Sequence, residues 1–121
     1  MVATGGGALT DNSSDSYIAV GSLTVSATER EVEFFLPPGY SAITNLQAYI
    51  TTAPGGGASW TLTVSKNGSG TALECSISGA AHSCRDSSIV AVVSGDKIDL
   101  DVTPFRSPAL ATITWSASLL P

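Results

Sequence analysis

Cys75 and Cys84 are the only two cysteines of this 121-residue chain. Gly79 and Ala80 lie between them and have the composition of a two-residue hairpin turn, which predicts that the cysteines face each other across neighbouring strands. Counted from that turn, the pair occupies a non-hydrogen-bonded site, where Cα atoms approach to about 4.5 Å, a separation that a disulfide tolerates. A structural disulfide is therefore the preferred interpretation. Two free thiols are the alternative, and a metal site is the weakest, because no second His or Cys cluster would complete it.

Catalytic chemistry has little support in the sequence. His82 is the only histidine and lies beside the predicted turn, where an exposed turn residue is a simpler interpretation than a general base. No motif of a serine nucleophile elbow, a phosphate-binding loop or a zinc protease occurs. We therefore expect no enzymatic activity, no catalytic residue and no cofactor.

Acidic side chains are the remaining candidates for a site. Asp96, Asp99 and Asp101 lie close together, and alternate positions of a strand project to the same side. Because Ca²⁺ takes six or more oxygen ligands, a solvated outer strand face is preferred over a cation site, and no metal is expected. The glutamates of residues 29–33 form a similar stripe, which predicts a wetted strand face that discourages edge pairing.

Length and charge exclude several classes of function. A chain of 121 residues fits a single domain that buries about two thirds of its surface on folding. The net charge is −5, and the five Lys and Arg residues are scattered, so nucleic acid is not expected as a partner. No apolar run approaches the length of a membrane span, so a membrane is not expected either.

The pattern of alternating apolar and polar residues predicts an all-β fold. Turn residues separate strand segments, among them residues 16–23, 29–36, 41–54, 60–65, 97–102 and 108–121. None of the connections is long enough for a crossover helix. These features predict an antiparallel β-sandwich, and a jelly roll of about eight strands fits the count. The predicted domain covers residues 16–121.

Residues 1–15 are mostly Gly, Ser, Thr and Asp around one Leu. This composition predicts a flexible N-terminal arm. The alternative is an arm that orders against a neighbouring subunit.

Several apolar side chains fall on strand positions opposite those assigned to the core. They are Phe35, Ile43, Tyr49, Val90 and Val92. A strand that is apolar on both sides implies that its second face is also covered. Since a chain of this size has no further layer of its own, these residues predict a homotrimer interface. The alternative is small clusters under loops.

One stretch carries a resemblance to known proteins. It combines "WTLTVSKNGSG", "TALECSI" and "VAVVSGDKIDLDV" over roughly residues 58–104. This combination resembles the trimeric jelly-roll modules of bacteriophage and bacterial surface proteins, which are similar to the globular heads of complement-type and tumour-necrosis-factor-like proteins. The resemblance implies a trimeric binding protein and carries no catalytic motif. The chain lacks the Gly-X-Y repeat of collagen-stalked members, which counts against a fibre-tip role.

The expected location follows from two opposing features. The opening "MVATGGGALT" lacks a secretory signal, whereas a disulfide is rare in the cytosol. Synthesis in the host cytoplasm and oxidation on a released virion reconcile them. We therefore expect a structural virion protein, namely a capsid decoration (cement) protein that binds the major capsid protein at the capsid surface as a homotrimer.

The alternative is a receptor-binding or glycan-binding head module of a phage tail fibre or surface adhesin. Its glycan contacts would come from the loops at residues 52–59 and 105–110. An aromatic platform is also expected there. Trp60 and Trp115 have core positions instead, which leaves Tyr17 and Tyr40 as the aromatic candidates.

Overall fold

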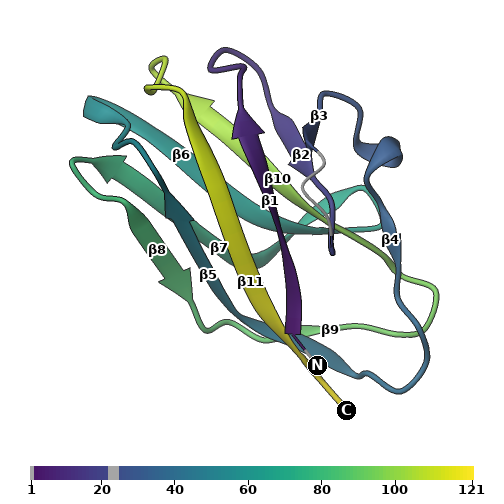
Figure 1. Cartoon of the computed structure of the whole chain (residues 1–121). Helices are drawn as coiled ribbons and strands as arrows, with labels where there is room; N and C mark the ends of the chain where they lie inside the picture. The colour runs from purple at the N-terminus through teal and green to yellow at the C-terminus, as the bar shows by residue number, and fades with distance from the viewer. Residues whose placement is uncertain (1, 22–24) are drawn as a thin grey trace.

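The computed structural model describes residues 2–21 and 25–121 and contains two antiparallel sheets packed face to face (Figure 1). Sheet I has the order β1 (Val2–Leu9), β11 (Ala111–Leu120), β5 (Ala42–Ile50), β8 (Ser83–Asp86), with β9 (Val90–Ala91) also paired to β5. Sheet II has the order β3 (Val25–Ser26), β2 (Ser16–Ile18), β10 (Lys97–Phe105), β6 (Gly55–Lys66), β7 (Ser69–Gly79), with β4 (Phe34–Phe35) paired to β10. The predicted antiparallel β-sandwich is confirmed, and jelly-roll topology stays a prediction.

The core lies between the two sheets and follows the predicted alternation. Trp60, Leu62 and Val64 on β6 point inward and have no exposed surface. Ile113 and Trp115 on β11 belong to the same buried cluster from the side of sheet I. Because full burial of one large apolar side chain contributes about 1.5–3 kcal/mol, this cluster is the main source of stability.

Residues 2–9 form the edge strand β1, so the prediction of a flexible arm over residues 1–15 is wrong for this part of the chain. β1 pairs with β11 along its whole length. Gly5 lies against the Ala19 carbonyl oxygen and the Trp115 indole, where a Cβ atom would clash. The glycines that suggested flexibility instead allow the close approach of neighbouring backbone.

The segment 29–36 is not the predicted eight-residue strand. It forms a 3₁₀ turn, η1 (Glu29–Glu31), followed by the two-residue strand β4. The Glu29 carboxylate accepts a hydrogen bond of 2.8 Å from the Ser65 hydroxyl of β6, so η1 is attached to sheet II through a side chain, whereas β4 is attached through its pairing with β10. The predicted strand 16–23 is also shorter, and its residues 22 and 23 lie outside the described residues.

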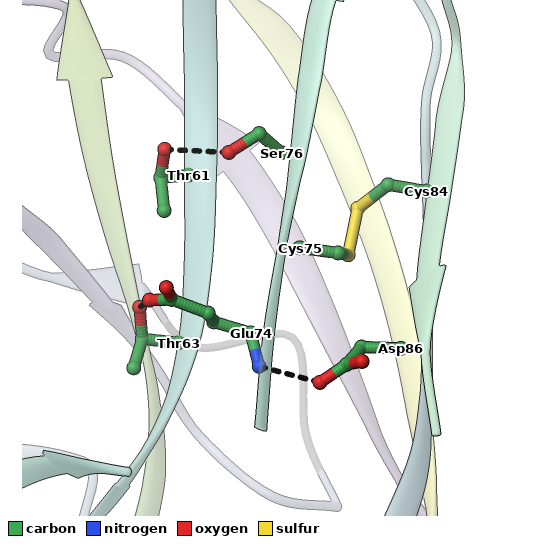
Figure 2. Close-up of a disulfide and its surroundings, with 7 residues drawn as sticks. All are labelled: Thr61, Thr63, Glu74, Cys75, Ser76, Cys84 and Asp86. Atoms are coloured by element: carbon green, nitrogen blue, oxygen red, sulfur yellow. Dashed lines mark hydrogen bonds between the residues drawn. A yellow bond between two sulfur atoms is a disulfide. The ribbon is translucent and has the colours of Figure 1, made fainter. Parts of the chain in front are cut away.

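The Cys75–Cys84 disulfide is confirmed, with a Cα–Cα distance of 5.8 Å (Figure 2). The predicted pairing of the two strands is wrong, because β7 pairs with β6 in sheet II and β8 pairs with β5 in sheet I. The turn itself forms, since the Ala81 amide donates to the Ser78 carbonyl oxygen at 3.1 Å. The chain then crosses to the other sheet, where each strand satisfies its backbone groups with a different partner. The bridge therefore joins the two sheets.

Strand β5 contains a bulge that changes which side chains face the core. Asn45 has φ of 54°, and β5 carries one more residue than β11 across this point. A bulge of one residue reverses the alternation on one side of it. Beyond the bulge, Leu46, Ala48 and Ile50 are buried as predicted.

Candidate functional site

Three of the side chains predicted to line a subunit interface lie on strands β4 and β5, and they differ in exposure. Phe35 is 66% exposed and Tyr49 is 51% exposed. Ile43 has no exposed surface, so its predicted outward orientation is wrong. The bulge at Asn45 is the reason, because it turns Ile43 toward the core.

The remaining two predicted interface residues lie in the segment that contains β9. Val92 is buried in the core, which contradicts its predicted orientation, and Val90 is half-buried against the same core. The Val92 amide donates to the Ser41 carbonyl oxygen at 3.0 Å, and this bond fixes the segment with Val92 inward. Ile89 and Val93 are the exposed side chains here. Contact of these exposed side chains with another subunit stays a prediction.

An open hollow of about 890 Å³ lies on the outer face of sheet I. Four strands cross beneath it, and their register aligns the outward positions in two rows. One row is Gly6, Thr114, Tyr49 and Ser83, and the next is Thr4, Ser116, Gln47 and Arg85. The positions on β1 and β11 carry small residues, whereas those on β5 and β8 include the two largest side chains of the rows. The hollow therefore lies over the small residues.

Tyr49 supplies an aromatic surface at the hollow. Its half-exposed ring stacks with the His82 ring at a centroid distance of 6.2 Å and an interplanar angle of 24°. His82 is exposed near the turn, as the sequence predicts, and its Nδ1 lies 3.2 Å from the Ile50 carbonyl oxygen. The two contacts hold both rings in place, so the platform is preorganised.

Polar side chains beside Tyr49 have free hydrogen-bonding capacity. Gln47 and Arg85 are direct cross-strand partners, and Ser116 is the partner of Gln47 on the other side. Within residues 2–21 and 25–121, the side chains of Gln47, Arg85, Thr114 and Ser116 make no intramolecular hydrogen bond. An aromatic surface with a few convergent polar groups is typical of a small-molecule site.

The disulfide helps to position Arg85. This residue lies on β8, which has only four residues and pairs with β5 on one side. Cys84 connects β8 covalently to β7, and the Asp86 carboxylate accepts a hydrogen bond of 3.2 Å from the Glu74 amide (Figure 2). Strand β8 is therefore attached to both sheets, and Arg85 is carried on a fixed backbone.

The outer face of sheet II carries a buried carboxyl group. Asp99 is fully buried, which contradicts the predicted solvated face, and in the described part of the chain no donor bonds to its carboxylate oxygens. Burial and the neighbouring Glu29 raise the pKa of Asp99 to about 8. Burial and the neighbouring Asp15 raise the pKa of Asp101 to about 7. Asp99 and Asp101 lie on the same face because they are alternate residues of β10, and the neighbouring Glu29 contributes to raising the pKa of both groups.

Asp96 does not belong to this group. Its carboxylate accepts hydrogen bonds of 2.9 Å from the Asn67 side-chain amide and from the Val93 amide, and these bonds lower its pKa. Asp96 therefore stabilises the turn before β10. Across the residues that the structure describes, no three His, Cys, Asp or Glu side chains are arranged to hold a metal ion.

The loops predicted to contact a glycan lie apart from the hollow. They touch each other, since the Ala109 amide donates to the Pro54 carbonyl oxygen at 2.9 Å. No described residue of either loop lines the hollow. Trp60 and Trp115 are core residues as expected. The site residues that sequence reasoning missed, such as Gln47 and Arg85, come together only through the strand order of sheet I.

No protein-family model matches the chain, and no curated protein matches it in sequence. Among the described residues, no helix is long and apolar enough to cross a membrane.

Proposed function

We propose that this chain is a non-catalytic glycan-binding module of a virus-particle surface protein, and that the sugar binds at the hollow of sheet I. The observation that carries the proposal is the Tyr49 ring, which is half-exposed and held by stacking on His82. The ring lies on the outer face of sheet I. The polar side chains beside it, those of Gln47, Arg85, Thr114 and Ser116, make no hydrogen bond within the described chain.

The chemistry of a sugar ring matches this arrangement. A pyranose has a C–H face that packs on an aromatic ring, and hydroxyl groups that need hydrogen-bond partners. Tyr49 supplies the ring. Gln47 offers a donor and an acceptor, and the hydroxyl groups of Thr114 and Ser116 can act as either. Because these side chains stand on paired strands, little backbone ordering is needed on binding.

The placement on a virion rests on the resemblance of residues 58–104 to phage surface modules and on the disulfide. A covalent link between the sheets suits a protein that functions in an oxidising environment. Display on a particle would also supply many copies, and multivalency raises the avidity of a weak sugar site.

The test is a glycan array with the purified protein, followed by titration of the best neutral or charged hit. Tyr49→Ala is expected to weaken binding at least tenfold, which corresponds to about 1.4 kcal/mol. Phe35→Ala is the matched control, because it removes another exposed aromatic ring that does not line the hollow. Equal losses in both variants, or no glycan bound by the wild-type protein, would contradict the proposal.

A second candidate function is capsid decoration by a homotrimer that binds the major capsid protein. The observation in its favour is a group of exposed apolar side chains, Phe35, Ile89 and Val93, with 66%, 70% and 65% of their surface exposed. Leu36, the residue after β4, forms backbone hydrogen bonds with Gly95 and Asp96 in the turn after Val93, which brings Phe35 and Val93 to the same end of the sandwich. A patch of this kind is typical of a contact surface.

Light scattering and sedimentation test this second function. A homotrimer at micromolar concentration, together with co-sedimentation on capsids that lack the protein, would support decoration. Substitution of Phe35 and Val93 by Asp is expected to reduce both trimer formation and co-sedimentation with capsids. A monomer that fails to bind capsids would leave glycan binding as the only function of the two.

A further inference from the structure

We propose that the hollow of sheet I selects a saccharide that carries a carboxylate or sulfate group, and that the Arg85 guanidinium binds this anionic group. The inference rests on the proposed function, because it assigns the class of sugar to the same site. Three observations support it: the charges around the hollow, the state of Arg85 and the register of the strands.

The charge around the hollow is opposite to that of the whole chain. The protein has ten Asp and Glu residues against five Lys and Arg, and its net charge is −5. Nevertheless, Arg85 is the one charged residue among those that line the hollow in the described chain. The adjacent Asp86 is attached to the Glu74 amide of sheet II (Figure 2). The hollow is therefore a locally basic site on an acidic protein.

Arg85 has no internal partner that would neutralise it. Among residues 2–21 and 25–121, no ion pair and no intramolecular hydrogen bond engages its guanidinium. Arg106, by comparison, lies over the Phe105 ring at 5.2 Å. A free guanidinium presents a planar fork of donors that matches a carboxylate or sulfate, and such charge-assisted bonds are about twice as strong as neutral ones.

The register places this fork beside the aromatic platform. Gln47 and Tyr49 are two positions apart on β5 and share the outer face, and Arg85 is the direct partner of Gln47. Two positions along a strand span about 6.8 Å, and neighbouring strands are about 4.8 Å apart. A sugar ring stacked on Tyr49 therefore has its exocyclic substituents within reach of Arg85. The Arg85 guanidinium would then bind an acid group carried by one of these substituents.

An extended polyanion fits less well. Nucleic acids and highly sulfated chains are bound by several cationic groups in series, and binding of each phosphate adds to the salt dependence. A single Arg on a protein with net charge −5 cannot supply this. The expected ligand is a saccharide with isolated acid groups, recognised mainly through one guanidinium.

Calorimetric titration with three matched probes tests the inference. The probes are a galactose oligomer that carries a single galacturonate residue, a neutral galactose oligomer of the same length and a singly sulfated galactose oligomer of the same length. The wild-type protein is expected to bind at least one acidic probe at least tenfold tighter than the neutral one. The comparison of the two acidic probes identifies carboxylate or sulfate as the preferred group.

Variants assign the effect to Arg85. Arg85→Gln is expected to lower affinity for the acidic probe to that for the neutral probe, while neutral binding changes less than twofold. Arg85→Lys keeps the charge but loses the fork, so an intermediate affinity is expected. Arg106→Gln, which makes the same change of net charge in a loop away from the hollow, should leave all affinities unchanged.

The possible failures are distinguishable. Equal binding of neutral and acidic probes, lost in Tyr49→Ala, would overturn the inference and leave the proposed function standing. No binding of any sugar would overturn both. An equal loss in Arg85→Gln and Arg106→Gln would show that overall charge is responsible, which also overturns the role of Arg85.

Discussion

Among single residues, Asp99 is the least expected. Its carboxyl group is fully buried on the outer side of sheet II, with Glu29, Glu33, Asp101 and Tyr17 around it. Burial raises the pKa of Asp99 to about 8, and the neighbouring acidic groups Glu29, Glu33 and Asp101 raise it in the same direction. A buried ionised carboxylate without a compensating charge is costly, so the group is kept protonated near neutral pH.

The raised pKa of Asp99 predicts how stability depends on pH. The unfolded value is 3.8 and the folded value is about 8, so the folded protein binds more protons between them. The free energy of unfolding must therefore be highest at the acid end of this range and fall as pH rises from about 4 to about 8. Asp101, with a folded pKa of about 7, acts in the same direction.

Asp99→Asn should remove most of this dependence. The amide is nearly isosteric and does not ionise, so we expect the variant to be more stable than wild type at pH 8, by on the order of 2 kcal/mol. Urea unfolding at pH 5 and pH 8 measures the difference. Asp11→Asn is the control at an exposed carboxyl group whose pKa is lowered. A wild-type protein that is more stable at pH 8 than at pH 5 would contradict this account.

At the scale of elements, β8 is a short strand that the disulfide supports. It has four residues and pairs with β5 alone within its sheet. The bridge connects it to β7 and closes a short loop, with a sequence separation of 9. Closing a loop of this length stabilises a protein by about 2.5 kcal/mol in the chain-entropy model.

Replacement of both cysteines by Ala is therefore expected to reduce the free energy of unfolding by about 2–3 kcal/mol, measured by urea titration. Because Arg85 lies on β8, the affinity for acidic sugar should fall as well. Ser78→Ala, a small change at an exposed position of β7, is the control. If the double variant is as stable as wild type, the bridge is not an important support of β8.

Element by element, the sequence predicts the strands better than their partners. The inward positions of Trp60, Leu62 and Val64 follow from simple alternation, and so does the disulfide from cysteine spacing. The inward orientation of Ile43 could not be predicted from alternation, because a single extra residue in β5 reverses the alternation. Sheet pairing is equally hidden: nothing local indicates that the cysteines join two sheets rather than two adjacent strands.

The candidate site was less predictable than the fold. Tyr49 stands out in the sequence as an aromatic residue on an outward position, and its exposure follows from that position. Gln47, Arg85 and Ser116 are ordinary polar residues of three different strands, and only the order β11-β5-β8 places them in one row. A site whose residues are brought together by the pairing of strands far apart in the sequence has no local sequence motif.

At the scale of the whole molecule, the two outer faces of the sandwich have different chemistry. In the described chain, sheet I presents an open polar hollow lined by one guanidinium, that of Arg85, and sheet II holds the buried carboxyl group of Asp99 beside Glu29 and Asp101. The disulfide connects the two sheets through β7 and β8. This division predicts that an anionic ligand approaches the face of sheet I.

The most direct test of the central claim is a titration of the ¹⁵N-labelled protein with its best sugar ligand, followed by two-dimensional NMR. The account predicts that the largest amide shifts fall on β5, β8 and β11, at Gln47, Tyr49, Arg85, Thr114 and Ser116. Shifts confined instead to residues 52–59 and 105–110, or to the surface around Phe35, would place the ligand elsewhere and contradict the account.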